Sequence, residues 1–341
     1  MGKKVNLVIS LVVGIAIFGI FLYKVGFYSV GEIFSNINLK YLSLYFLVTT
    51  VAFFPTAWRW KIILKAYKKK ISFIDMLRYT IAGYAVSYIT PSVRVGGEPL
   101  RAYMIKKEHN VDLKTGSSSI IIDKFIEFAG TAVFGLIGLI LFLALPQIPT
   151  SYKIIFGILV VLAFSILFLF YYRTITSNGS FSSLFLSLRL HKISKLKYFV
   201  SVLKDVEKKM EKFFLKNKKE FLLSSSTYLI YGVLVFFEFK LLLLSFGIDG
   251  SFSTIVLALN LWGLANFFPV PAALGVLEAG QTGLFSLIKG AGSIGFALSL
   301  LIRARALLFV AIGFTIISYF GGKQFDNKEK KIFKKSFFRL K

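Results

Sequence analysis

Long apolar runs alternate with short, strongly basic segments, and no other feature of this sequence constrains the fold as much. A run of roughly 20 apolar residues can cross the hydrocarbon core of a bilayer, which is about 30 Å thick. Of the 341 residues, 56% are hydrophobic and only 17% are charged. We therefore predict an all-α, polytopic membrane helix bundle. The apolar runs are Leu7–Tyr23, Tyr41–Trp58, Ser72–Thr90, Ser119–Leu145, Lys153–Tyr172, Phe221–Phe246, Phe252–Phe268 and Ser293–Phe320, with a weaker stretch at Ala279–Ile288.

The first run, Leu7–Tyr23, follows two lysines, as the apolar core of a signal peptide also would. No clear small-residue cleavage site comes after it, so we expect a retained first membrane helix.

Basic residues predict the orientation. The chain carries 42 Lys and Arg against 16 Asp and Glu, which gives a net charge of +26. Lys and Arg accumulate in cytoplasmic loops, so a multi-pass protein of the cell membrane with both termini in the cytoplasm is expected. The segments expected inside are the N-terminus, 59–70, 173–220, which contains a predicted amphipathic helix at Lys195–Lys219, and 323–341. The segments expected outside are 24–40, 146–152 and 247–251.

The positive charge would also attract anionic lipid headgroups. Nucleic-acid binding is not expected, because the basic segments are short and tied to membrane helices.

Loop charge further predicts about six full spans and two re-entrant hairpins. The chain is expected inside at both Lys70 and Lys114, so residues 72–107 should enter the membrane, break at Thr90-Pro91 and return. The same reasoning predicts a second hairpin at 252–290, broken at Pro269-Val270-Pro271. Broken backbone at membrane depth is tolerated only where it packs in protein or lines a wet cavity.

The two hairpins match each other at an offset of about 180 residues, and loop charge places them in opposite orientations. Gly83, Ala85, Pro91 and Glu98 align with Gly263, Ala265, Pro271 and Glu278. Inverted repeats with broken helices are typical of secondary transporters, and the breaks mark the substrate site. We predict a first repeat at 1–150, a second repeat at 151–322 with a basic insertion at 173–220, and a basic tail at 323–341.

The first break predicts a pocket for a phosphate-bearing headgroup. Pro99 suits the first turn of a helix, whose free N–H groups favour an anion. Two flanking arginines can grip phosphate with paired hydrogen bonds. Alternatively, Glu98 caps the helix and pairs with one of these arginines. The candidate substrate-binding residues here are Pro91, Arg94, Gly96, Gly97, Glu98 and Arg101.

The second break contributes Pro271, Gly275 and Glu278 to the candidate substrate site. Glu278 could bind a coupling proton or cation, pair with an arginine of another helix, or lie at the outer interface.

Charged residues within the apolar runs are candidates for a substrate pathway, because such groups are costly at membrane depth. For the two arginines of the last run, snorkelling to the interface is an equal alternative. Arg59, between Trp58 and Trp60, is expected to anchor a helix end. The pathway candidates are Asp123, Glu127, Glu238, Lys240, Arg303 and Arg305.

Signatures of an enzyme are largely missing. The chain has no P-loop, no zinc-protease motif and no nucleophile elbow. It has no cysteine, and its two histidines, His109 and His191, lie in basic polar segments where solvation is expected rather than metal binding. Residues 290–295 match a dinucleotide fingerprint by spacing, but small residues there are expected to permit close helix packing. We expect no cofactor and no metal.

The segment Thr90-Pro-Ser-Val-Arg-Val-Gly-Gly-Glu-Pro-Leu-Arg-Ala-Tyr103 resembles a motif of the lysylphosphatidylglycerol synthase transmembrane, or flippase-like, membrane protein family. Phe268-Pro-Val-Pro-Ala-Ala-Leu-Gly-Val-Leu-Glu278 resembles that family's second motif, and the resemblance extends from about Leu7 to Phe320. It implies a module that flips aminoacylated phospholipid between leaflets. No soluble synthase domain is expected in this chain, so synthase activity is not carried over.

Three hypotheses remain at this point. The first is a flippase-like transporter for a phospholipid or another lipid with an anionic or phosphate-bearing head. The second is a membrane enzyme acting on lipid-linked headgroups, with Glu98 or Asp123 as the base. The third is a non-catalytic scaffold for a separate lipid-modifying enzyme.

Overall fold

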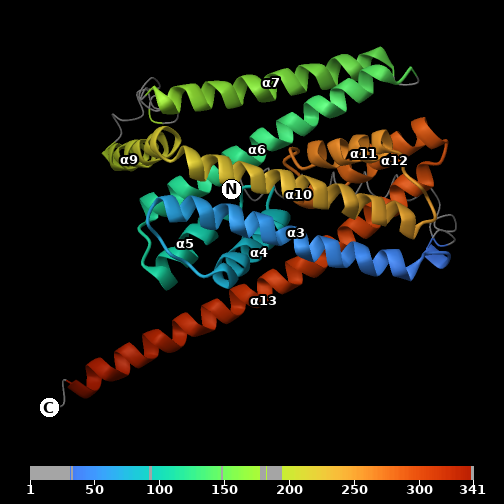
Figure 1. Cartoon of the computed structure of the whole chain (residues 1–341). Coiled ribbons are helices and arrows are strands. Elements are labelled where there is room, and N and C mark those ends of the chain that lie inside the picture. Colours follow the sequence, from blue (N-terminus) through green and yellow to red (C-terminus); the bar gives the residue numbers. More distant parts are fainter. Residues whose placement is uncertain are drawn as a thin grey trace.

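The computed structural model describes residues 34–91, 94–146, 149–176 and 194–338, together with Gly31 and Ser182. These residues form a bundle of helices without strands (Figure 1). The predicted helix at Leu7–Tyr23 and His191 lie outside the described residues. The helices are α3 (Leu39–Ala66), α4 (Phe73–Ile89), α5 (Glu98–His109), α6 (Leu113–Ala144), α7 (Thr150–Ile175), α9 (Ser194–Lys216), α10 (Lys218–Ser245), α11 (Phe252–Ala265), α12 (Val276–Lys289) and α13 (Gly292–Phe338), with a 3₁₀ turn, η2 (Pro271–Ala273).

Among the described helices, five are long and apolar enough to cross a membrane, which confirms the predicted polytopic bundle. They are α3, α6, α7, α10 and residues Gly292–Gly322 of α13. All five begin before or end after the predicted apolar runs, and two of them extend by six residues or more at one end, because helical hydrogen bonding continues into the basic segments. Helix α3 runs on to Ala66 rather than ending at Trp58, and α6 begins at Leu113 rather than at Ser119.

Local sequence explains the first break. The hydroxyl of Ser72 accepts a hydrogen bond from the amide of Asp75 and so caps the start of α4. Thr90 is extended, at φ −96° and ψ 138°, as expected for a residue before proline, and α4 therefore ends at Ile89. Pro99 lies in the first turn of α5, which ends at His109 and is capped by Asn110 in the left-handed conformation.

Both broken segments fold back on themselves, as the hairpin prediction requires. At the open end of the first hairpin, the Tyr79 hydroxyl of α4 lies 2.5 Å from Glu108 Oε2 and 2.9 Å from His109 Nε2 of α5. In the second hairpin, the side-chain amide of Gln281 in α12 donates to the carbonyl oxygen of Ala258 in α11 at 2.8 Å.

Helix packing follows the pattern that the predicted repeat implies. Helices α3 and α10, which the repeat equates, lie side by side. Helix α4 packs on α13 as α11 packs on α6, and α5 packs on α6 as α12 packs on α13. Each of these contacts therefore has a counterpart with the two predicted halves exchanged. The inverted orientation of the two halves and the boundary between them stay predictions.

Close backbone approach allows α12 and α13 to pack tightly. A Cβ atom on Gly295 would lie 2.2 Å from the carbonyl oxygen of Gln281, so only glycine fits there. The glycine-rich segment at 290–295 thus serves helix packing, as expected.

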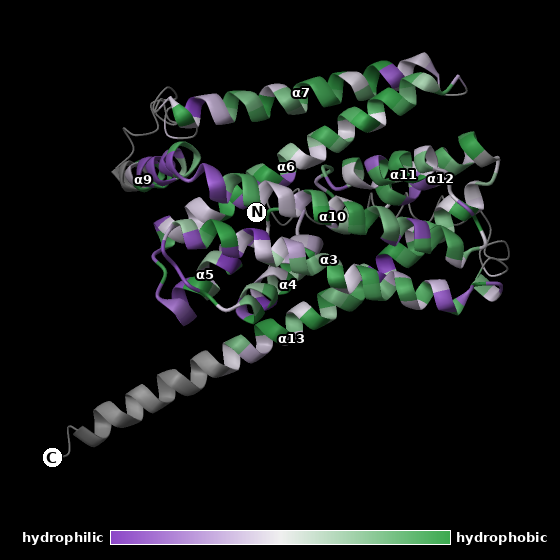
Figure 2. Ribbon diagram, viewed as in Figure 1, coloured by the Kyte–Doolittle hydropathy of each residue, from purple (hydrophilic) through white to green (hydrophobic). Residues whose placement is uncertain are grey.

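The outer surface divides into an apolar and a basic region. Helix α7 is largely green in Figure 2. Among its residues only Phe156, Val160 and Thr174 are buried within the described structure. Purple residues gather on α9 and also around α5. Helix α9 is amphipathic, as predicted: it buries Val206, Met210 and Phe213 against the bundle and leaves lysines exposed.

Candidate functional site

A cavity of about 140 Å³, with both acidic and basic side chains in its lining, lies between the two breaks. It is lined by residues of α3, α4, α5, α6, α10, α11 and α13 and by the second break. On α3 its lining runs from Thr49 to Arg59, which corresponds to about 15 Å at 1.5 Å of helical rise per residue. The cavity therefore follows α3 for roughly half the thickness of a bilayer core.

Asp123 is the centre of a buried charge cluster at one end of this cavity. Its Oδ1 lies 2.5 Å from Nε of Arg59, and its Oδ2 lies 3.0 Å from a terminal nitrogen of Arg101. These three residues come from α6, α3 and α5, so one carboxylate joins three helices. We call the whole cluster the first ion network; its members are Arg59, Glu98, Arg101, Asp123, Lys124 and Glu127.

The remaining contacts close the first ion network into a ring. Glu98 accepts from Arg101 at 2.8 Å and contacts the ammonium of Lys124 at 3.1 Å. Lys124 also contacts Glu127 at 3.0 Å, and Glu127 lies 3.4 Å from Arg59. Three cations thus face three carboxylates, which offsets the cost of removing these charges from water.

Glycine allows the first break to approach α4 closely enough to build this network. A Cβ atom on Gly97 would lie 1.9 Å from the carbonyl oxygen of Gly83. The amide of Gly97 donates to the Ser87 hydroxyl at 2.8 Å, which fixes the start of α5 against α4. The Arg101 guanidinium then lies 4.0 Å from the ring centroid of Trp60.

The second break is held by Glu278 and Arg303. Glu278 is fully buried; it accepts from the amide of Gly275 at 2.8 Å and forms a two-point ion pair with Arg303. Arg303 also donates to the carbonyl oxygens of Ala272 and Ala273, at 3.0 and 3.2 Å. Both alanines have positive φ, 56° and 51°, which is strained for residues with a Cβ atom. Arg303 therefore stabilises an unfavourable backbone.

A separate buried pair, Glu238 of α10 with Arg305 of α13, lies at the other end of the cavity. The Arg305 guanidinium is 5.0 Å from the ring centroid of Trp262 in α11. Glu238 and Arg305 are only 4% and 5% exposed, so this pair lies inside the protein.

Several hydrogen-bond donors around the cavity have no acceptor. Arg101 and Arg305 line the cavity, and their buried Nε atoms are unpaired within the described structure; the buried hydroxyl of Tyr45 is also unpaired there but lies outside the lining. Arg94, which also lines the cavity, has no carboxylate partner there and contacts the ring of Trp262 at 5.4 Å. Of the described residues, five basic and four acidic side chains line the cavity, and Arg94 is the excess positive charge. Such a site favours an added anion.

Comparison with known proteins identifies the family. The family described as the lysylphosphatidylglycerol synthase TM region matches residues 7–313. The chain belongs to this family. This membership confirms the resemblance that the two motifs indicated.

Curated relatives of this family member are membrane proteins of archaea. A UPF0104 membrane protein of Methanothermobacter thermautotrophicus is 24% identical over 276 residues, which cover 77% of this chain and 80% of the relative. A UPF0104 membrane protein of Pyrococcus horikoshii is 21% identical over 305 residues, covering 86% and 90%. One from Methanocaldococcus jannaschii is 26% identical over 110 residues, which cover 32% of each chain. No solved structure matches.

Seven of the fifteen predicted site residues of this family member line the cavity. Arg94, Glu98 and Arg101 of the first motif line it, and Gly97 sets the turn; Gly96 and Pro91 lie in the break without lining it. Of the second motif, Pro271 is buried in η2, and Gly275, at φ 79°, and Glu278 form the start of α12. Among the pathway candidates, Asp123, Glu127, Glu238 and Arg305 line the cavity.

The structure corrects the expected position of Arg59, shows where Lys240 lies, and decides between the two positions considered for the arginines of the last run. Arg59 does not anchor a helix end: it is 1% exposed inside α3, because the helix continues to Ala66 and turns Arg59 toward Asp123. Lys240 lies away from the cavity, 41% exposed and 3.9 Å from Asp249. Arg303 and Arg305 are paired inside the protein, so they do not snorkel.

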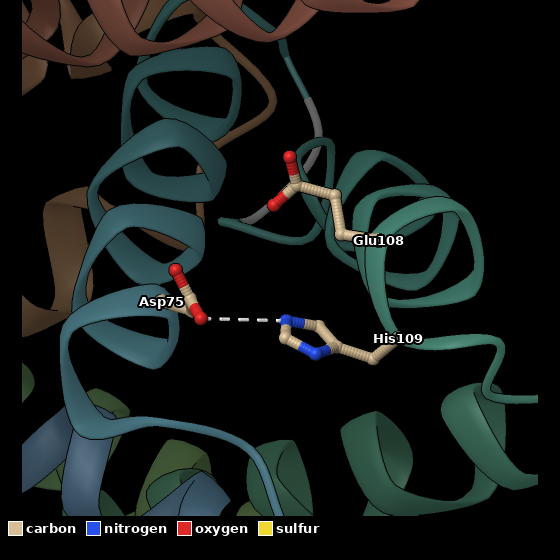
Figure 3. A group of neighbouring side chains, drawn as sticks. All are labelled: Asp75, Glu108 and His109. Carbon is tan, nitrogen blue, oxygen red and sulfur yellow. Dashed lines mark ion pairs between the residues drawn. The ribbon is translucent and has the colours of Figure 1, made fainter.

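A second group of polar side chains lies at the open end of the first hairpin (Figure 3). The ligand atoms of Asp75, Glu108 and His109 lie within 4.8 Å of one another, a spacing that one divalent cation could bridge. Each group already has a protein partner: Asp75 pairs with Arg78 at 3.3 Å and His109 at 3.6 Å, while Tyr79 binds Glu108 and His109. In this structure the group therefore closes the hairpin through ion pairs and hydrogen bonds.

Proposed function

We propose that this protein moves a phospholipid, or another lipid with a phosphate-bearing head, between the two leaflets of its membrane. The observation that carries the proposal is the cavity between the two breaks, lined by Arg94, Arg101 and Arg305, with donor groups that lack acceptors. Phosphate oxygens accept charge-assisted hydrogen bonds from guanidinium groups, so a headgroup would satisfy these donors.

The positions of the charges along the helices support a transport path. Arg59 lies seven residues before the end of α3 at Ala66, next to the basic segment expected inside. Glu238 lies seven residues before the end of α10 at Ser245, next to the weakly charged link expected outside. The two ends of the cavity therefore lie toward opposite faces. Ser87 lines the space between them, and its hydroxyl, which accepts from Gly97, keeps a proton to donate to a passing headgroup; Thr49 and Thr56 also line it but donate their protons to backbone carbonyl oxygens.

The two breaks are the elements expected to move. Broken half-helices from opposite halves line the substrate site in many transporters, and rocking of the halves exposes it to each side in turn. Here α4 contacts η2 of the second break, so both halves contribute to one site. Acyl chains would stay in the bilayer while the head passes through the polar cavity.

Geometry at the carboxylates favours transport over headgroup chemistry. A general base needs a lone pair within reach of the proton that it removes. Glu98 is engaged by Arg101 and Lys124, and Asp123 by Arg59 and Arg101. Their oxygens are therefore committed to ion pairs. Product formation from a lipid substrate by the protein in detergent, where no leaflets exist, would favour the enzyme instead.

Flipping is tested in liposomes with a nitrobenzoxadiazole-labelled phosphatidylglycerol and dithionite, which bleaches only the outer leaflet. We expect the wild type to flip the label well above the rate of protein-free liposomes. The double variant Glu98→Gln/Arg101→Ala should flip it at least about tenfold more slowly, because hydrogen bonds to charged groups contribute about 1.5–3 kcal/mol each.

Lys240→Gln is the matched control, because it removes a charge from a membrane helix outside the cavity. It should flip the label at the wild-type rate. Equal rates for wild type and the Glu98→Gln/Arg101→Ala variant, with both proteins monodisperse, would contradict the proposal.

A further inference from the structure

Arg94 differs from the other cations of the cavity in how it is held. Arg59, Arg101, Lys124 and Arg305 each contact a carboxylate. Arg94 has none within the described structure, and its guanidinium lies 5.4 Å from the ring centroid of Trp262. Its backbone is left-handed, at φ 61°, a conformation unfavourable for a residue with a Cβ atom. The side chain is therefore presented to the cavity by a strained turn and retained by an aromatic ring.

Trp262 connects parts of both predicted halves. It belongs to α11 of the second hairpin, whereas Arg94 belongs to the first break. The same indole ring receives Arg305 of α13 at 5.0 Å. Arg305 is also paired with Glu238, so it keeps a partner if the ring contact is lost. Arg94 contacts no carboxylate in the described structure; Glu127 of the first ion network lies near enough to attract it electrostatically without touching it.

We infer that Trp262 is a positioning residue, which holds Arg94 over its ring until a phosphate group enters the cavity and takes the guanidinium. This inference rests on the proposed function. It adds the residue that holds the phosphate-binding arginine before a headgroup arrives. Charge-assisted hydrogen bonds to phosphate are stronger than a cation–π contact, so phosphate competes successfully for Arg94. Release of Arg94 separates the first break from α11, which links headgroup binding to movement of the two halves.

The competition predicts how Trp262 variants bind a soluble phosphate ester. The test measures binding of sn-glycerol 3-phosphate to the purified full chain by isothermal titration calorimetry. We expect Trp262→Leu to bind roughly fivefold more tightly than wild type, because phosphate no longer has to displace the indole ring. Trp262→Phe, which keeps a ring face for the guanidinium, should stay within about twofold of wild type.

A double-mutant cycle with Arg94→Ala tests whether Trp262 acts through Arg94 or only lines the cavity. In the Arg94→Ala background, Trp262→Leu should change affinity by less than about twofold, because the competing contact is already gone. If Trp262→Leu changes affinity equally with and without Arg94, the positioning role is overturned and the proposed function stands. If Trp262→Leu does not tighten binding at all, the positioning role is likewise overturned.

Failure of the proposed function gives a different result. Wild-type protein that binds no glycerol phosphate, or binds it equally with Arg94→Ala, contradicts an anion site at Arg94 and overturns both proposals. Parallel titrations with inorganic phosphate distinguish a glycerol phosphate head from free phosphate. Binding of inorganic phosphate at least as tight as that of the ester would assign the site to the free anion and overturn the lipid proposal.

Discussion

Arg59 and Asp123 lie 64 positions apart in the chain and form an ion pair of 2.5 Å in which each side chain is only 2% exposed. The pair fixes the rotation of α3 relative to α6. It also fixes Arg101, which contacts the other oxygen of Asp123, so α5 is placed by the same carboxylate. One acidic side chain thus determines how the first break meets the spanning helices.

Asp123→Asn should destabilise the protein by about 3–5 kcal/mol. Removing one partner of a buried ion pair leaves an uncompensated charge, and here two arginines lose their shared carboxylate. Chemical unfolding in detergent, followed by circular dichroism, measures the loss. Lys240→Gln, whose side chain is 41% exposed, should change stability by less than about 1 kcal/mol. A loss below about 1 kcal/mol for Asp123→Asn would disprove the central role of this carboxylate.

Variants of Glu238 and Arg305 can separate the contribution of charge to stability from the contribution of packing. Glu238→Leu and Arg305→Met should each cost about 3–5 kcal/mol, because each leaves the other charge buried alone. The double variant should recover most of that loss, because both charges are then gone and an apolar pair replaces them. Thermal unfolding of all four proteins measures the coupling. Additive losses would mean that the two side chains do not interact.

Gly83 and Gly263 occupy equivalent positions in the predicted repeat but differ in their surroundings. A Cβ atom on Gly83 would lie 2.7 Å from the Arg101 side chain, which Glu98 and Asp123 hold in place, whereas Gly263 has nothing within 4 Å. Gly83→Ala should therefore cost about 1–3 kcal/mol through overpacking. Gly263→Ala should be neutral or stabilise α11 by up to about 1 kcal/mol. Similar effects of both changes on the unfolding midpoint would contradict the close approach of α4 and α5.

Acid should weaken the contact between α9 and α6. The ammonium of Lys114 pairs with the carboxylate of Asp205 and lowers its pKa below the ordinary value of 3.8. A lowered pKa means that the pair stabilises the fold above the ordinary pKa and is lost as the pH falls below it. Amide hydrogen exchange in α9, corrected for its intrinsic pH dependence, should therefore be less protected at pH 3 than at pH 5. Asp205→Asn should remove most of this difference; an unchanged difference would assign it to other groups.

Hydropathy and proline positions predicted much of the fold. Both are local properties: an apolar run partitions into lipid wherever its neighbours lie, and Pro91 ends α4 through its own ring. The motif residues Arg94, Glu98 and Arg101 were also predicted, because a broken helix that carries charge at membrane depth needs a packed or wet environment. The return of both hairpins followed from loop charge alone.

The role of Arg59 was not predicted. Its flanking tryptophans favoured a position at the membrane interface, and nothing within the segment indicated that α3 continues for another two turns. The signal that could have found it lies elsewhere: Asp123 and Glu127 share one face of α6 and require buried cations. Lys240, a predicted pathway residue, is turned by its helix toward Asp249, and it does not line the cavity.

The sequence by itself therefore determined that this chain is a membrane helix bundle, where two of its helices break, and which charged residues accompany the breaks. Only the tertiary structure decided which groups meet: Arg59 with Asp123, Arg303 with Glu278, Arg305 with Glu238, and Arg94 with an indole ring. The physical reason is that an ion pair depends on the rotation and depth of two helices that are distant in sequence. These quantities are set by packing over the whole bundle and not by any local pattern.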